Sequence, residues 1–208
     1  MTATATEPAV LSPATALPTA VSRQVFRAVL DALARPGRPA RLPVAPGSGV
    51  ARRPPAALLP ILALADLGTG IHVLDHPDAP TSWVDALATA TSAPVVTLER
   101  ARLVGALRPI TPAEVGALSR GTALAPEEAA LLTVAVTDLT GGPARWVLSG
   151  PGVPGRRAIS PSGVPAGFLA ARAAAVHRYP TGTDVLLVAP DGGLLGLPRS
   201  TSIEEEGN

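Results

Sequence analysis

The sequence predicts an α/β fold in which helices flank a mixed β-sheet. From residue 22 to about residue 117, helical segments alternate with short apolar runs typical of buried strands. The later part of the chain instead has pairs of apolar runs separated by turn sequences. Apolar residues make up 47% of the 208 residues, enough for a sizeable core. Alternation of helices and strands favours parallel strands, and strands joined by short turns favour antiparallel pairs, so we expect both kinds of pairing in one sheet.

A single domain is expected over residues 21–203, between two tails. Residues 1–20 are rich in Ala, Thr and Pro and carry one charge, a composition that buries little surface and predicts disorder. The chain ends in an acidic stretch, with three consecutive glutamates at 204–206. Residues 202–208, and the acidic tail 204–208 within them, are therefore predicted to be solvated.

The first third of the domain is predicted to contain two helices. Ser22 can cap a helix that runs to about Ala34, where an Arg-Pro-Gly sequence ends it. A Pro-rich loop at 38–53 follows, and residues 56–67 are apolar nearly all round, which predicts a buried helix. The apolar stripe of the first helix consists of Val25, Phe26, Val29, Leu30 and Leu33.

Three strands and two helices are expected in the middle of the chain. Residues 71–74, 95–98 and 102–106 are short apolar runs typical of buried strands. Thr81 can cap a helix that continues to about residue 91. Thr111, followed by Pro and by an acid three positions on, predicts another helix start.

Two hairpins and one helix complete the predicted fold. Residues 131–138 and 144–149 flank an LTGGP turn and are predicted to pair as a hairpin. Residues 165–177 form the last expected helix. A buried strand at 185–188, a PDGG turn and a strand ending at Leu197 predict the closing hairpin.

The end of that closing hairpin is the first candidate site. Pro198 cannot donate to a sheet, so the chain should leave the sheet there and present Arg199, Ser200 and Thr201. A guanidinium with two hydroxyls suits an anionic group or an interface. A solvated surface Arg is the alternative. Asp184, at the preceding turn, is interpreted as a cap that accepts backbone N–H groups, with acid–base work as the alternative.

Two further segments are candidate anion-binding or interface sites. Gly150 and Gly152 follow an apolar strand, where backbone N–H groups can face a phosphate, although the proline between them removes one donor. A plain turn explains the same residues. Arg35 and Gly37 form a basic corner after the first helix, suited to a phosphate or to a carboxylate of another subunit. A helix end that simply favours a cation is the alternative.

Composition excludes several classes of chemistry. The chain has no Cys, so disulfides, thiolate catalysis and Cys-based metal sites are excluded. All 17 basic residues are Arg, and without a Lys amine neither a pyridoxal phosphate (PLP) aldimine nor a Walker A loop can form. His72 and His76 lie near Asp75 and Asp78, but their spacing fits no strong metal pattern, and we expect no metal. No nucleophile-elbow motif predicts a Ser-His-Asp triad.

Nucleic acid and membranes are also unexpected partners. Aromatic residues make up only 2% of the chain, and its net charge is +1 without a dense basic run. The longest apolar stretch, residues 56–65, is too short to span a bilayer. No signal peptide is evident, so we expect a cytoplasmic protein.

Segments in the same order and at similar spacing resemble the PhnH subunit family of the bacterial carbon–phosphorus lyase system. They are FRAVLDALARPG at 26–37, LAD at 64–66, LSGPGV at 148–153, and the C-terminal YPTGTD at 179–184 with LPRST at 197–201. The resemblance runs from about Val21 to Ile203. It departs at Thr181, where family members often carry Arg or a bulky residue, and at Ser200, where they tend to have Thr.

The resemblance implies a fold like the large domain of PLP-dependent transferases, without PLP or another cofactor. It also implies a subunit of the complex with ribose 1-methylphosphonate 5-triphosphate synthase activity, which joins a phosphonate to the ribose of ATP and releases adenine. Nucleosidase chemistry is usually placed on another subunit, so the implied role is a scaffold or accessory one. A homodimer that docks to PhnG, PhnI and PhnJ types is implied. A stand-alone nucleotide- or phosphate-binding enzyme is the alternative.

Overall fold

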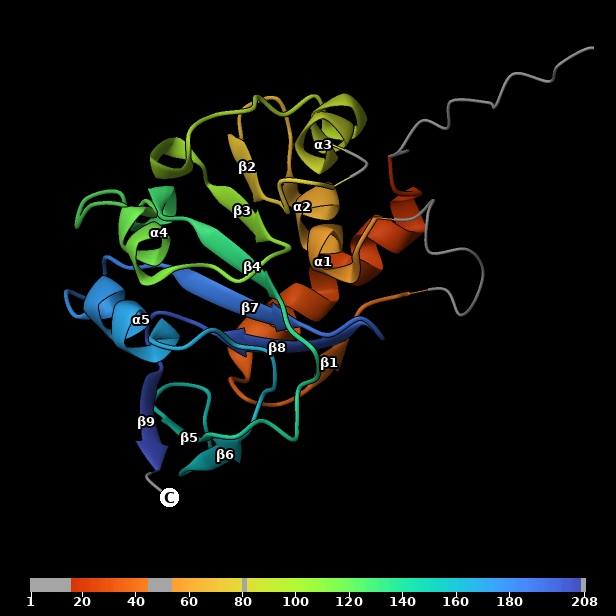
Figure 1. The fold of residues 1–208 in the computed structure, drawn as a ribbon. Coiled ribbons are helices and arrows are strands. Elements are labelled where there is room, and N and C mark those ends of the chain that lie inside the picture. Colours follow the sequence, from red (N-terminus) through yellow and green to blue (C-terminus); the bar gives the residue numbers. More distant parts are fainter. Residues whose placement is uncertain (1–15, 45–53, 80–81, 207–208) are drawn as a thin grey trace, which may run out of the picture.

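A six-stranded mixed sheet forms the centre of the structure, a computed structural model that describes residues 16–44, 54–79 and 82–206 (Figure 1). Its strands are β1 (Ala40–Arg41), β2 (Ile71–Leu74), β3 (Leu103–Ala106), β4 (Leu131–Ala135), β7 (Asp184–Val188) and β8 (Gly193–Leu197). They lie in the order β1-β8-β7-β4-β3-β2. The neighbours from β2 to β7 are parallel, and β8 is antiparallel to both β7 and β1. The predicted mixed sheet is confirmed.

Helices cover both faces of this sheet (Figure 1). Residues of α1, α2 and α3 share one hydrophobic cluster with one face, and residues of α4 and α5 share another cluster with the opposite face. Burying apolar side chains on both faces is what makes the central strands almost wholly apolar. The helices are α1 (Thr19–Ala34), α2 (Leu59–Leu64), α3 (Trp83–Thr91), α4 (Pro112–Ala117) and α5 (Phe168–Val176).

The first predicted hairpin is wrong, because its second strand belongs to a separate, three-stranded antiparallel sheet. This sheet contains β5 (Arg145–Ser149), β6 (Arg157–Ile159) and β9 (Ser202–Glu206), in the order β6-β5-β9. The predicted partner of β5, β4, instead lies inside the main sheet between β3 and β7. The LTGGP segment does not close a hairpin, because its backbone pairs with the segment before α5: Gly142 N donates to the carbonyl of Ser160 at 2.8 Å.

The prediction that residues 202–206 are a solvated tail is wrong. The backbone of β9 pairs with all five residues of β5, from Ser202 opposite Ser149 to Glu206 opposite Arg145. The glutamate side chains nevertheless stay exposed, where Glu206 pairs with Arg145 and Glu204 pairs with Arg156. The acidic composition therefore does not exclude a strand, because a strand's backbone bonds do not depend on side-chain charge.

Helix α1 begins earlier than predicted and is buried along a narrower stripe. It starts at Thr19, before the expected cap Ser22, so the predicted disorder does not extend to residue 20; residues 1–15 lie outside the described part of the chain. Phe26 and Leu30 are 46% and 51% exposed. The buried stripe comprises Val25, Val29 and Ala32. Gly196 of β8 allows α1 to approach the sheet closely, since a Cβ there would lie 2.3 Å from the Ala32 carbonyl oxygen.

Three predicted elements are shorter or absent. Residues 56–67 form a 3-10 turn and then α2, which ends at Leu64. The strand predicted at 95–98 is only a single bridge to Ile71, because the chain turns at once into a 3-10 helix, Leu98–Arg100. Helix α5 starts at Phe168 because Gly167 has a left-handed backbone. The predicted cap Thr81 lies outside the described residues.

The predicted start of α4 is confirmed as a capping box. Glu114 N donates to Thr111 Oγ1 at 3.2 Å, and Thr111 N donates to Glu114 Oε2 at 2.8 Å. Arg108 Nη2 adds an ion pair to Glu114 Oε1 at 2.6 Å. The bond from Arg108, helped by those from Thr111 and opposed by burial, lowers the pKa of Glu114 to about 2.

Glu114→Gln should remove a pH-dependent part of the stability. The folded pKa lies below the ordinary value of 4.5, so the carboxylate's contribution is full above pH 4.5 and is lost as the pH falls toward 2. We expect the variant to lose about 1 kcal/mol of unfolding free energy at pH 7 and less as the pH falls. Urea unfolding at several pH values measures this. Glu127→Gln, at an exposed glutamate, is the control, and a pH-independent loss would contradict the assignment.

Candidate functional site

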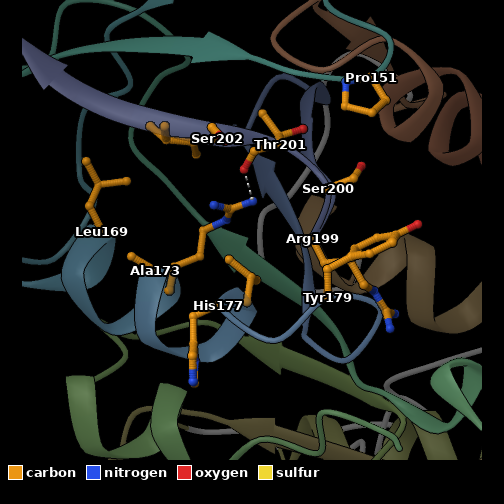
Figure 2. Close-up of a pocket in the computed structure, with 12 residues that line it drawn as sticks. Pro151, Leu169, Ala173, His177, Tyr179, Arg199, Ser200, Thr201 and Ser202 are labelled. Carbon is orange, nitrogen blue, oxygen red and sulfur yellow. Dashed lines mark hydrogen bonds between the residues drawn. The ribbon is translucent and has the colours of Figure 1, made fainter. Parts of the chain in front are cut away.

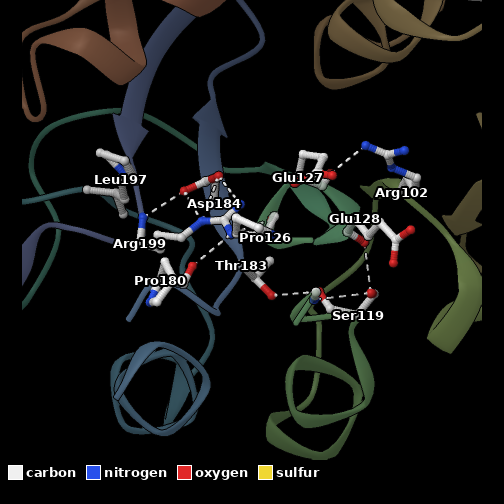
Figure 3. Close-up of polar contacts among 12 residues, drawn as sticks. Arg102, Ser119, Pro126, Glu127, Glu128, Pro180, Thr183, Asp184, Leu197 and Arg199 are labelled. Carbon is white, nitrogen blue, oxygen red and sulfur yellow. Dashed lines mark hydrogen bonds and ion pairs between the residues drawn. The ribbon is translucent and has the colours of Figure 1, made fainter. Parts of the chain in front are cut away.

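An ion pair between β7 and the segment after β8 organises the C-terminal corner of the fold (Figure 3). Asp184 is the first residue of β7, and Arg199 lies two residues beyond the end of β8. Arg199 Nη2 lies 2.6 Å from Asp184 Oδ2, and Nε lies 3.2 Å from both carboxylate oxygens. The backbone N–H of Arg199 also donates to Oδ1 at 2.7 Å. Asp184 thus accepts a backbone N–H, but that N–H belongs to Arg199 and not to the turn that Asp184 was interpreted to cap.

The other end of the Arg199 guanidinium bonds two backbone carbonyls. Nη1 donates to Pro126 O at 2.8 Å and to Pro180 O at 3.2 Å. The side chain is only 15% exposed. The chain does leave the sheet after Leu197, but Arg199 then turns inward, so most of its donors are occupied within the protein. We call Asp184, Arg199 and these two carbonyls the Arg199 clamp.

The 3-10 turn Pro126–Glu128, which the clamp contacts, is held from other sides as well (Figure 3). Ser119 Oγ donates to Glu128 O at 2.9 Å, and Arg102 donates to Glu127 O. Thr183, next to Asp184, donates to Ser119 O at 3.4 Å. The start of β7, the 126–128 turn and the loop after β8 are therefore fixed together through polar contacts from several elements.

A cavity of about 570 Å³ lies beside the clamp, between α5 and the segment that leads into β9 (Figure 2). Its volume is in the range of small-molecule sites. None of the described residues that line it is acidic. The lining residues are Pro151, Leu169, Arg172, Ala173, Val176, His177, Tyr179, Arg199, Ser200, Thr201, Ser202 and Ile203.

Arg172 of α5 is the lining residue that the sequence analysis missed. It is only 3% exposed, and its Nη2 donates to Pro198 O at 2.7 Å and to Thr201 O at 3.1 Å. Burial lowers the pKa of Arg172 to about 10, and the nearby Asp184 carboxylate partly opposes this. The guanidinium therefore stays charged at neutral pH. The available signal was its place as the lone charge in the helix FLAARAAAV.

The predicted residues Ser200, Thr201, Gly150 and Gly152 gather near this cavity. Ser200 is half-buried, and Thr201 is 2% exposed with an Oγ1 that has no hydrogen-bond partner. Gly150 has φ +117°, and a Cβ there would lie 2.9 Å from Ser200 O. A Cβ on Gly152, whose φ is +79°, would lie 2.4 Å from the carbonyl oxygen of Ala34. At both glycines the backbone thus packs too closely for a side chain larger than hydrogen.

Arg35 and Gly37 do not line the cavity. Arg35 pairs with Asp31 one turn back along α1, in an exposed position. Gly37 N donates to Gly196 O at 3.4 Å, and a Cβ on Gly37 would meet the side chains of Arg157 and Leu148. The basic corner predicted after the first helix is therefore a surface pair beside a packed turn, separate from the cavity.

The polar groups of residues 72–76, which contain two of the histidines, form hydrogen bonds within the fold. His72 Nδ1 lies 2.9 Å from Val96 O, and Asp75 accepts the backbone N–H of His76 at 2.9 Å. In the part of the chain that the structure describes, no three His, Asp or Glu side chains are grouped to hold a metal ion. Nor does any described helix have the length and apolar character that crossing a membrane requires.

Sequence comparison assigns the family. The profile described as "Bacterial phosphonate metabolism protein (PhnH)" matches residues 13–204, which include all the resembling segments. The chain belongs to the PhnH family. The curated "Alpha-D-ribose 1-methylphosphonate 5-triphosphate synthase subunit PhnH" of Rhizobium meliloti (strain 1021) is 30% identical over 208 residues, covering 95% of this chain and 97% of that relative. The resemblance identified from the motifs is confirmed.

Removing either half of the clamp in this PhnH-family chain should destabilise it strongly. Arg199→Ala leaves a partly buried carboxylate without its cation, and Asp184→Ala does the reverse, so each should cost about 3 kcal/mol of unfolding free energy. The double variant should lose less than the sum by about 1 kcal/mol or more. Arg156→Ala, from a pair that is 60% and 66% exposed, is the control and should cost far less. If denaturant unfolding shows that the double variant loses the full sum of the two single losses in unfolding free energy, Asp184 and Arg199 are not coupled and the clamp is refuted.

Proposed function

We propose that this chain is the PhnH-type subunit of a carbon–phosphorus lyase core complex. In this role it supports the reaction in which a phosphonate is joined to C1 of the ribose of ATP, adenine leaves, and ribose 1-phosphonate 5-triphosphate forms. The observation that supports the proposal most strongly is the near full-length match to a subunit of alpha-D-ribose 1-methylphosphonate 5-triphosphate synthase.

The proposed role is that of a cytoplasmic scaffold or accessory subunit. The partners are a second copy of this chain and subunits of the PhnG, PhnI and PhnJ types. The helix-flanked mixed sheet, together with a sequence that has no Lys, supports a fold related to the large domain of PLP-dependent transferases that works without PLP. The polar side chains that line the cavity beside the clamp can all donate hydrogen bonds, which suits binding and assembly.

A stand-alone nucleotide- or phosphate-binding enzyme is the second candidate function. The cavity beside Arg172 favours it, since a positively charged hollow of about 570 Å³ suits a phosphorylated ligand. The two functions differ in one measurement. Release of adenine from ATP by the purified chain alone supports the second function, and release only after the other subunits are added supports the first.

Co-expression of the tagged chain with its PhnG-, PhnI- and PhnJ-type subunits tests the proposed function. We expect the four to elute together and to release adenine from ATP when methylphosphonate is present, whereas the complex without this chain should be inactive. Growth on methylphosphonate as sole phosphorus source, in a strain lacking its own PhnH, measures the same requirement. Failure to co-elute, or full growth without the chain, would contradict the proposal.

A further inference from the structure

We propose that the cavity between α5 and the 198–203 segment is a binding site for a phosphoryl-type oxyanion, a phosphate or phosphonate group, with Arg172 as its principal ligand. This rests on the proposed function and specifies what the subunit would contribute to it. The inference differs from the expectation drawn from sequence, which centred on Arg199. It is carried by the burial of Arg172, by the charges around it and by unpartnered donors beside the cavity.

The hydrogen bonds of Arg172 leave part of its guanidinium unused. Within the described chain, all of its hydrogen bonds come from Nη2, to the carbonyls of Leu197, Pro198 and Thr201. Nε is buried and has no acceptor. A buried cation whose donors are only partly satisfied is costly, since each unpaired donor loses its bond to water. Nη1 makes no hydrogen bond within the described chain and is not among the fully buried atoms, so it is the donor that a bound oxyanion can reach.

The charges around the cavity favour an anion. Arg172 and Arg199 both line it, and the carboxylate whose charge acts on Arg172, that of Asp184, is bound by Nε, Nη2 and the backbone N–H of Arg199. Two guanidinium groups therefore share one carboxylate, which leaves one formal positive charge in excess. Because the lining contains no acidic residue, an incoming anion would meet no like charge.

Hydroxyl groups surround the same space. Ser200, Thr201 and Ser202 are consecutive lining residues, and Thr201 Oγ1 is buried without a partner. A guanidinium presents several donors in one plane, and hydroxyls from another element can reach an oxygen outside that plane. This arrangement matches the three peripheral oxygens of a phosphoryl group better than the two oxygens of a planar carboxylate.

The size of the cavity indicates that the oxyanion belongs to a larger molecule. About 570 Å³ exceeds what a free phosphate fills. Tyr179, the one tyrosine of the chain, lines the cavity and is 72% exposed, so its ring is available to a sugar or base attached to the anion (Figure 2). A phosphorylated sugar or nucleotide is therefore the class of ligand that the site fits best.

Substitutions at Ala173 test the site and keep Arg172, since loss of that buried side chain would also disturb folding. Ala173 is exposed on α5 and lines the cavity, so Ala173→Glu brings a carboxylate to the site, whereas Ala173→Gln brings the same bulk without charge. Ala174→Glu is the matched control, because Ala174 is exposed but does not line the cavity. Glu and Gln are both good helix formers, so the three substitutions should leave α5 helical.

The measurement is calorimetric titration of the full-length chain with inorganic phosphate, methylphosphonate and ATP at constant ionic strength. We expect saturable binding of at least one probe. Ala173→Glu should weaken that binding about tenfold or more, which corresponds to about 1.4 kcal/mol of repulsion. Ala173→Gln and Ala174→Glu should each weaken it less than about threefold. Circular dichroism confirms that each variant is folded. Binding of ATP but not of the two smaller anions would support a phosphorylated sugar or nucleotide as the ligand, as the size of the cavity indicates.

Two results would overturn the inference: no saturable binding of any of the three probes, or binding that Ala173→Glu and Ala173→Gln weaken equally. Either result leaves the proposed function standing if the chain still co-elutes with the other subunits and supports growth on methylphosphonate. Loss of co-elution by the unmodified chain would instead remove the proposed function, whatever the titrations show.

Discussion

The ion pair between Asp184 and Arg199 fixes the loop after β8 against the start of β7, and the geometry of the C-terminal corner follows from it. The pair is mostly shielded from water and includes a bond to the backbone of Arg199, so it fixes the loop as well as the side chain. It also joins the start of β7 to the 126–128 turn through Pro126 O. A buried ion pair is weak evidence for net stability, because replacing both partners by apolar residues often costs nothing. Its directed bonds nevertheless define the geometry of the groups that they join. Here that definition sets the carbonyls that Arg172 contacts.

This constraint explains why two arginines so close together have different roles. Arg199 is satisfied by a carboxylate and two carbonyls, and so acts as an internal connection. Arg172 contacts carbonyls alone, and it lines a cavity with no acidic residue. A subunit that assists chemistry elsewhere in a complex needs to hold a charged ligand without reacting with it, and a guanidinium, which does not lose its proton at neutral pH, is suited to that.

The sequence predicted those features that depend on neighbouring residues. The capping box at Thr111 and the hairpin of β7 and β8 follow from turn residues and apolar runs that are adjacent in the chain. The pairing of β9 with β5 joins residues 53 to 61 positions apart, and the acidic sequence of β9 did not indicate it. The burial of Arg172 was invisible for the same reason, because its surroundings come from the 197–201 segment. Family membership was recognisable because several short motifs keep their order.

The most direct test of the account is the side-chain Nε–H resonance of Arg172 in ¹⁵N-labelled protein, assigned by comparison with Arg172→Lys. A buried Nε–H should exchange slowly with water and give a resolved peak. We predict that saturating ATP or methylphosphonate moves this peak, while the Nε–H peak of Arg199 stays in place because Asp184 already holds it. An Arg172 peak that does not move at saturation, or an Arg199 peak that moves in its stead, would contradict the account.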